Sequence, residues 1–367
     1  MIELRGVTKR YGAFTAVDDI SFRVEQGEVC VLIGPSGCGK STTLKLINRM
    51  LEPTAGEIYV NERSVRSERP EDLRRNIGYV IQSVGLFPHM SVSENIAVVP
   101  RLLKWKENRI EERTRELLDL IGLRHDRYGA KYPHELSGGE AQRIGVARAL
   151  AADPPLLLMD EPFGAVDPLN RQALQAEFLK IQRKLKKTVV FVTHDLDEAI
   201  RLADRIVLLF RGRIVQHDTP EELLARPATG FVRSFVGTDR ALKRLSRFNV
   251  SDYMRSAPSC SRFDGELVAH LQSYKAAGIR FLWITEQSGV LCGWIDLRRL
   301  EDPALFDNAI TQIDPAETAV KASFSLREAL SRMLGQGIRT APVVDDETRL
   351  VGEISLNDIE RITESEP

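Results

Sequence analysis

Hydrophobic runs of four or five residues recur along the first 235 residues, and helix-forming stretches lie between them. Polar or turn-forming residues bound these runs, which predicts short buried strands. The predicted strands are Val29–Ile33, Leu156–Met159, Val189–Thr193 and Ile206–Phe210, and the predicted helices are Lys40–Met50 and Ala141–Ala152. Strands that alternate with helices are typical of an α/β domain.

A helical pattern interrupts this alternation at about residues 88–135. Hydrophobic residues between Ile110 and Ile121 recur at helical spacing. Ser91 stands three residues before Glu94, the arrangement of a helix-capping box. We expect a helical subdomain inserted into the α/β domain.

The chain beyond Val250 contains an internal repeat. Residues 278–280 (Gly-Ile-Arg) recur as residues 337–339, a displacement of 59 residues. Residues 291–297 recur at the same displacement as residues 350–356. The repeat predicts two copies of one small α/β module.

The length of 367 residues favours two or three domains at roughly 150 residues each. We expect an α/β domain at residues 1–235, a linker at 236–249, and the two repeated modules at 250–308 and 309–367. The basic stretch Arg240–Arg247 in the linker suits a short helix with a solvated face.

Composition excludes several classes of protein. Lys and Arg number 51 against 52 Asp and Glu, a balance that argues against a globally basic nucleic-acid-binding protein. No hydrophobic run approaches the roughly 20 residues of a membrane helix, and the N-terminus is too polar for a signal peptide. The four cysteines lack C-x-x-C spacing, so a zinc site or disulfide framework is not expected. We expect a soluble, intracellular chain.

The segment Gly34–Ser41 matches the phosphate-loop pattern G-x-x-x-x-G-K-[ST]. It follows a predicted strand and opens a predicted helix, the context that this motif requires. The glycines let backbone N–H groups face a phosphate, and the helix directs its positive end at the same anion. We expect Lys40 to reach the β- and γ-phosphates of a nucleotide and the Ser41 hydroxyl to bind Mg²⁺.

Two acidic residues follow the buried run at Leu156–Met159. The carboxyl ends of strands in α/β sheets are where ligands bind. Asp160 would hold Mg²⁺ through water, and Glu161 would act as the general base toward the attacking water.

A second anion-binding nest is predicted at Ser137-Gly138-Gly139, at the start of the helix-forming stretch. One nucleotide does not need two nests from one chain, so this nest would serve the γ-phosphate held by another copy in a head-to-tail dimer. A simple helix-capping turn is the alternative for this segment taken alone.

These motifs together resemble those of the ATP-binding-cassette (ABC) ATPases. The phosphate loop at Gly34–Thr42, the signature at Leu136–Glu140 and the acidic strand at Leu156–Glu161 stand in the order of that family. The resemblance implies a P-loop NTPase core of the ABC type with an inserted helical subdomain. It also implies that ATP and Mg²⁺ bind between the phosphate loop of one copy and the signature of the other.

The resemblance assigns roles to further residues. Gln82 resembles the glutamine that senses Mg²⁺ and contacts the transporter subunit, and His194 the switch histidine at the γ-phosphate. Tyr11 stands where the family stacks an aromatic ring on adenine, and Asp167 stands in the family's dimer-contact loop. The alternatives are that Tyr11 packs in the core and that His194 is an ordinary surface residue. The expected catalytic residues are Lys40, Gln82, Glu161 and His194; the nucleotide-binding ones are Tyr11, Gly34, Pro35, Ser36, Gly37, Cys38, Gly39, Lys40, Ser41, Thr42, Ser137, Gly138, Gly139, Glu140 and Asp167; the metal ligands are Ser41, Gln82 and Asp160.

The chain departs from the family pattern at two positions. Glu140 stands where the signature commonly has glutamine, and Val166 where the dimer-contact loop usually has leucine. Neither change removes a catalytic group.

The segments 81–89 and 97–105 resemble the importer cassettes for quaternary amines such as glycine betaine, carnitine and choline. In the tail, residues 339–345 and 350–355 resemble a cystathionine-β-synthase (CBS) domain, so the repeat would form a C-terminal α/β CBS pair. The first copy has Phe-Leu-Trp at 281–283 where the second has Thr-Ala-Pro, which argues against a symmetrical ligand site.

The resemblance implies a homodimeric ATPase on the cytoplasmic face of the cell membrane. Its partners would be membrane permease subunits and, indirectly, a substrate-binding protein, with a nucleotide or ionic-strength signal acting at the CBS pair; no nucleic acid is expected. The alternatives are an importer ATPase for a different small solute and a soluble ABC ATPase without a transport role. The second is disfavoured because the chain has one cassette and no heptad run.

Overall fold

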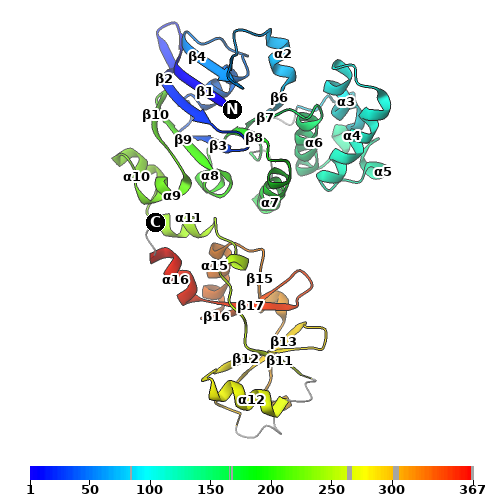
Figure 1. Ribbon diagram of the computed structural model, residues 1–367, viewed down its shortest axis with the longest axis vertical. Helices are drawn as coiled ribbons and strands as arrows, with labels where there is room; N and C mark the ends of the chain where they lie inside the picture. Colours follow the sequence, from blue (N-terminus) through cyan, green and yellow to red (C-terminus); the bar gives the residue numbers. More distant parts are fainter. Residues whose placement is uncertain (83–84, 165, 167, 263–266, 301–305, 365–367) are drawn as a thin grey trace. The chain divides into compact units, whose positions relative to one another are not determined.

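Two units of the chain make most of their contacts internally, Met1–Thr238 and Asp239–Pro367. The computed structural model describes residues 1–367 apart from 83–84, 165, 167, 263–266, 301–305 and 365–367 (Figure 1). Each unit is described by itself below.

A six-stranded sheet lies at the centre of the first unit, in the order β10-β9-β3-β8-β7-β6. Every strand runs parallel to its neighbours except β10, which is antiparallel to β9. Both faces of the parallel strands are buried, which explains their continuous hydrophobic sequences and confirms the four predicted strands. The bounds are β3 Val29–Ile33, β6 Ile77–Val80, β7 Leu156–Asp160, β8 Thr188–Val192, β9 Arg205–Phe210 and β10 Arg213–Asp218.

The helices of this unit begin and end at recognisable local features. The helix expected at 40–50 ends at Ile47, because Arg49 takes a left-handed backbone conformation with φ +48°. The helix expected from 141 begins three residues earlier, because Ser137 caps it. The bounds are α1 Lys40–Ile47, α2 Pro70–Arg75, α6 Gly138–Leu150, α7 Pro168–Leu185, α8 Leu196–Leu202, α9 Pro220–Ala225 and α10 Gly230–Val236.

A second sheet, antiparallel and in the order β2-β1-β4-β5, was not predicted from the sequence. Its hydrophobic residues alternate with polar ones, and the hydrophobic side joins a core cluster with residues of α1 and the six-stranded sheet. Figure 1 shows this sheet in blue beside the N-terminus. The bounds are β1 Ile2–Tyr11, β2 Phe14–Val24, β4 Ala55–Val60 and β5 Arg63–Ser64.

The expected helical subdomain is present, drawn in cyan in Figure 1. Its first helix is capped as predicted: Ser91 Oγ accepts a hydrogen bond from Glu94 N (3.3 Å), and Glu94 Oε2 accepts one from Ser91 N (2.7 Å). Hydrophobic residues of α3 and α4 share a core cluster with α6 and the sheet. The bounds are α3 Val92–Leu102, α4 Glu107–Leu120, α5 His125–Tyr128 and the 3-10 helix η1 Pro133–Glu135.

The second unit contains the repeated module twice. In each copy the first strand is parallel to the second and the second is antiparallel to the third. The strand pair Phe281–Thr285 and Leu291–Asp296 reappears 59 residues later as Thr340–Val344 and Leu350–Ser355. The bounds are α11 Arg240–Leu245, η2 Val250–Asp252, β11 Ser259–Ser261, α12 Leu267–Ala276, β12 Phe281–Thr285, β13 Leu291–Asp296, α13 Phe306–Ala309, β14 Thr311–Gln312, α14 Pro315–Thr318, β15 Val320–Lys321, α15 Leu326–Gln336, β16 Thr340–Val344, β17 Leu350–Ser355 and α16 Leu356–Glu364.

The two copies are joined by a reciprocal pair of backbone hydrogen bonds. Leu291 N donates to Thr348 O (3.1 Å), and Leu350 N donates to Gly289 O (3.0 Å). Leu350 and Thr348 are the repeat equivalents of Leu291 and Gly289, so the same bond is made in both directions. The two hairpins are therefore related by an internal pseudo-two-fold axis.

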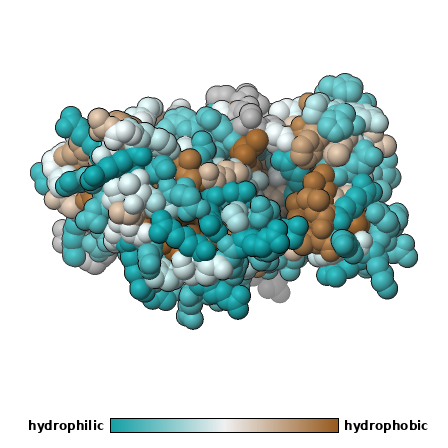
Figure 2. All heavy atoms as spheres, turned by 90° about the horizontal axis from the view of Figure 1, so that it is seen from above, coloured by the Kyte–Doolittle hydropathy of each residue, from teal (hydrophilic) through white to brown (hydrophobic). Residues whose placement is uncertain are grey.

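Among the helices of the described residues, each is too short or too polar to cross a bilayer. On the face shown in Figure 2, hydrophilic side chains predominate and hydrophobic ones gather in small separate patches.

Candidate nucleotide-binding and catalytic site

The phosphate loop lies between β3 and α1, where the sequence predicted it. Lys40 is buried, and its Nζ donates hydrogen bonds to the carbonyl oxygens of Gly34 (2.7 Å) and Pro35 (3.0 Å). The loop thus curls around the lysine ammonium group. A nucleotide phosphate is the anion that this cation and the N-terminus of α1 would attract together.

Two glycines of the loop have no room for a side chain. A Cβ atom at Gly34, which has φ +148°, would stand 2.1 Å from Leu209 O. A Cβ atom at Gly39, with φ +106°, would stand 2.5 Å from Ala16 O. The loop can take this shape only with glycine at both positions.

Ser41 and Asp160 join the two halves of the site. Ser41 Oγ donates a hydrogen bond of 3.0 Å to Asp160 Oδ1, although the two motifs are far apart in the sequence. Burial raises the pKa of Asp160, and the hydrogen bond from Ser41 opposes that effect. Hydroxyl and carboxylate oxygens are ligands of the type that Mg²⁺ prefers, so this pair fits the expected metal site.

Glu161 brings together three of the expected catalytic residues. Gln82 Nε2 donates a hydrogen bond of 2.8 Å to Glu161 Oε2, and His194 Nδ1 lies 3.4 Å from Glu161 Oε1. The backbone of Glu161 is left-handed, with φ +45°. This strained conformation turns the side chain at the end of β7 toward Gln82 and His194.

The signature segment forms a helix cap centred on Glu140. Glu140 Oε2 accepts hydrogen bonds from Ser137 N (2.8 Å) and Ser137 Oγ (2.9 Å), and Tyr128 OH donates to Glu140 Oε1 (2.7 Å). These hydrogen bonds lower the pKa of Glu140 to about 2, and the bond from the Ser137 backbone has the largest effect. Among the described residues, no hydrogen bond or ion pair joins this cap, which includes Gly138 and Gly139, to the phosphate loop.

Tyr11 lies at the end of β1, at a tight turn into β2. The residue is 48% exposed, and Lys9 Nζ lies 5.1 Å from the ring centroid. The exposure rules out the alternative that Tyr11 is a core residue. Asp167, expected in the dimer-contact loop, lies outside the described residues.

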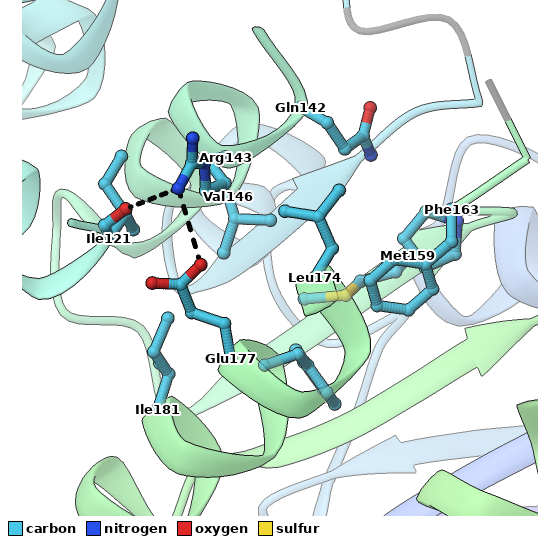
Figure 3. Close-up of a pocket in the computed structure, with 11 residues that line it drawn as sticks. Ile121, Gln142, Arg143, Val146, Met159, Phe163, Leu174, Glu177 and Ile181 are labelled. Carbon is cyan, nitrogen blue, oxygen red and sulfur yellow. Dashed lines mark hydrogen bonds and ion pairs between the residues drawn. The ribbon is translucent and has the colours of Figure 1, made fainter. Parts of the chain in front are cut away.

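A cavity of about 30 Å³ lies between α6 and α7 (Figure 3). Its lining is almost entirely apolar, and at its edge Arg143 Nη1 donates to Ile121 O and Glu177 Oε2, both at 3.4 Å. The space suits a water molecule or two rather than a nucleotide. The phosphate loop therefore remains the candidate nucleotide site.

Sequence reasoning missed a group of polar residues behind His194. They form two pairs between α7 and the start of α8: Arg171 lies beside Asp195, and Gln175 donates a hydrogen bond to Glu198. No motif signalled Arg171, Gln175 or Glu198, because each is an ordinary polar residue of a helix. Only Asp195, at a helix N-cap position ahead of Glu198, carries a local sequence signal.

Comparison with known proteins shows the family of the chain. The family model for ABC transporters matches residues 17–164, and that for the CBS domain matches residues 312–363. The glycine betaine/carnitine/choline transport ATP-binding protein OpuCA of Bacillus subtilis is 45% identical over 97% of this chain and 94% of its own length. The chain belongs to the ABC transporter family. It is an ATP-binding subunit and an ATPase of this family.

Two further relatives and one solved structure support the assignment. The osmoprotectant import ATP-binding protein OsmV of Salmonella typhimurium is 46% identical, and the choline transport ATP-binding protein OpuBA of Bacillus subtilis 44%; each match covers 97% of this chain and 94% of the relative. The ATP-binding cassette MJ0796, solved as a dimer in a post-hydrolysis state with ADP and Pi, is 33% identical with a TM-score of 0.54. That match covers 60% of this chain and 99% of MJ0796.

Proposed function

We propose that this chain is the ATP-hydrolysing subunit of an importer for quaternary amine osmoprotectants of the glycine betaine, carnitine and choline class. The observation that carries the proposal is the likeness to relatives named for choline, carnitine and osmoprotectant transport along nearly their whole length, including the repeated tail. The clustering of Gln82 and His194 on Glu161 supports the ATPase activity.

Each residue of the site has a role in this proposal. The phosphate loop and Lys40 bind the phosphates of ATP, and Tyr11 stacks on the adenine. Glu161 accepts the proton of the attacking water as general base, while Gln82 and His194 hold its carboxylate in place. Ser41 and Asp160, with Gln82, would hold Mg²⁺, whose charge would offset that of the phosphates.

The active form in this proposal is a head-to-tail dimer. Ser137, Gly138 and Gly139 at the N-terminus of α6 would face the γ-phosphate bound by the second copy, and Asp167 would lie at the contact. The N–H groups and positive helix end there suit an anion. MJ0796 is a dimer in the solved structure that resembles this chain.

The proposed place of the subunit is the cytoplasmic face of the cell membrane, bound to permease subunits and served by a substrate-binding protein. Residues 1–235 would form the ATPase domain and 236–249 the linker. Residues 250–308 and 309–367 would form a CBS pair that regulates transport in response to a nucleotide or to ionic strength.

Uptake of radiolabelled glycine betaine, choline and carnitine tests this proposal, in cells that lack the chain, at low and high osmolarity. We expect uptake of at least one solute to be lost, and to be restored by the wild-type chain but not by Lys40→Ala. Unchanged uptake of all three would overturn the solute class and favour a different small solute.

A further inference from the structure

Two chain segments start at or beside Glu161 and lead into different helices. The first is a pair of consecutive turns: Gly164 N donates to Glu161 O (3.1 Å), and Val166 N donates to Phe163 O (3.2 Å). The second begins beside Glu161 at the end of β8, where Glu161 N donates to Val192 O (3.0 Å), and continues into the loop of His194. The first segment leads into α7 and the second into α8.

Arg171, in the first turn of α7, connects the far ends of these segments. Its Nη2 donates a hydrogen bond of 3.2 Å to Val166 O, and its Nη1 lies 3.8 Å from Asp195 Oδ2. The side chain is 29% exposed, and that of Asp195 is 35% exposed, so the pair is only partly hydrated. These contacts and the chain between them form a closed ring from Glu161 through His194, Asp195, Arg171 and Val166, and back to Glu161 through the two turns.

Asp195 is itself fixed in this ring. Its Oδ1 caps α8 by accepting hydrogen bonds from Asp197 N (2.9 Å) and Glu198 N (3.2 Å), which leaves Oδ2 for Arg171. A movement of the His194 loop therefore moves the carboxylate that Arg171 holds.

A second connection runs parallel to the first. Glu198 is buried and accepts hydrogen bonds from Thr193 Oγ1, just before His194, and from Gln175 Nε2 on α7 (3.5 Å). The helix that follows the Glu161 turn is thus joined to the His194 loop at two points, one turn of α7 apart.

We infer that Arg171 is a positioning residue for ATP hydrolysis, which makes the His194 loop and the turn at Val166 move as one body. A planar guanidinium group reaches a carboxylate and a carbonyl at once in a fixed geometry, which a lysine ammonium group does not. The consequence of this inference rests on the proposed function, in which Asp167, the residue after Val166 in the sequence, lies at the dimer contact. A change in the position of His194 beside one bound ATP then moves, through Arg171, the segment that contacts the other copy.

ATP hydrolysis by the full chain tests this role through Arg171→Gln, Arg171→Lys and Asp195→Asn. Asparagine still caps α8 but loses the charge that pairs with Arg171. Arg183→Gln is the matched control, since Arg183 is an exposed arginine on the same helix. The measurements are kcat, KM for ATP, the Hill coefficient for ATP and the melting temperature.

For Arg171→Gln we expect kcat to fall about tenfold or more, as a displaced reacting geometry would produce, with KM for ATP and the melting temperature close to the control. The Hill coefficient should fall toward one, Asp195→Asn should act in the same direction, and Arg171→Lys should recover part of kcat. A kcat equal to that of Arg183→Gln would overturn the inference, and so would a loss of kcat that only follows a loss of melting temperature. A wild-type chain without ATPase activity would instead overturn the proposed function.

Discussion

The carboxylate of Glu161 and the imidazole of His194 lie 3.4 Å apart at the ends of two neighbouring parallel strands, β7 and β8. The two strands follow one another in the chain with α7 between them, and their parallel pairing brings the two side chains to one edge of the sheet. Glu161 is 21% exposed in its side chain and His194 is 62% exposed, so the acid is sheltered and the histidine faces outward. This difference suits a base that is held in place and a histidine that is free to meet a ligand.

Glu161→Gln should separate binding from hydrolysis. A glutamine oxygen can still accept the hydrogen bond from Gln82, but it cannot take a proton from water. We expect ATP hydrolysis to fall by about 100-fold or more, with ATP affinity unchanged, because general-base catalysis contributes roughly that factor. Hydrolysis and nucleotide binding are measured on the same preparation, with Glu112→Gln on the exposed side of α4 as control. Normal hydrolysis by the Glu161 variant would show that Glu161 is not the general base.

Gly34→Ala and Gly37→Ala should differ sharply. The added methyl group at Gly34 meets a backbone oxygen at 2.1 Å, whereas at Gly37 nothing lies within 4 Å. Both have positive φ, so Gly37→Ala carries only the backbone strain of about 1–2 kcal/mol. We expect Gly34→Ala to lose ATP binding and Gly37→Ala to retain most of it, as measured by titration calorimetry. Equal affinities in the two variants would show that the loop adapts.

Glu198→Gln should change how stability depends on pH. Burial raises the pKa of Glu198 from its usual 4.5 to about 7, so the folded chain keeps a proton that the unfolded chain releases between these values. The stability contributed by neutral Glu198 is full below pH 4.5 and is lost as pH rises to about 7. Relative to wild type, the variant should gain on the order of 3 kcal/mol between pH 4.5 and 8.

The measurement is the difference in melting temperature between the variant and the wild type at each pH. This difference should be several degrees more favourable to the variant at pH 8 than at pH 5. The groups that face Glu198 are Thr193, Asp195, Gln175 and Arg171, and only Asp195 opposes its ionisation by charge. Melting curves that run parallel from pH 5 to 8 would contradict the raised pKa.

Trp283→Phe should weaken the packing contact between the two repeated modules. Trp283 Nε1 donates a hydrogen bond of 2.9 Å to Glu353 Oε2, and both residues are buried. The variant leaves a buried carboxylate oxygen without this donor, at a cost of about 1–3 kcal/mol. Hydrogen exchange of the full chain should accelerate in β12 and β17. Trp294→Phe, on the adjacent strand β13, is the control, and equal acceleration in both variants would show that only ring volume matters.

Local sequence was enough to place the phosphate loop, the acidic strand end and the Ser91 cap. Each of these depends on neighbouring residues, through glycine conformation, a buried hydrophobic run or a capping side chain. The antiparallel sheet of β1 and β2 was missed because an alternating pattern does not specify which strand it pairs with. Nor did the sequence indicate that Arg171 meets Asp195, since the contact depends on how two helices lie after folding.

The tail shows the same limit. The difference between Phe-Leu-Trp at 281–283 and Thr-Ala-Pro in the second copy was visible in the sequence and argued against symmetry. That Trp283 would reach Glu353 in the other copy was not visible, because the contact arises from the packing of two modules. Arg255 Nε, 3.1 Å from Glu353 Oε1, completes this asymmetric cluster.

The bonds between Leu291 and Thr348 and between Leu350 and Gly289 make the tail a dimer within one polypeptide. Each copy supplies the acceptor that the other copy's hairpin lacks, so a solitary copy would display an unsatisfied donor and acceptor at its hairpin end. Such an end is complementary to itself, and a lone second copy would therefore pair with its twin through the same two bonds. Fusion of the copies into one chain replaces that concentration-dependent encounter with a permanent tether.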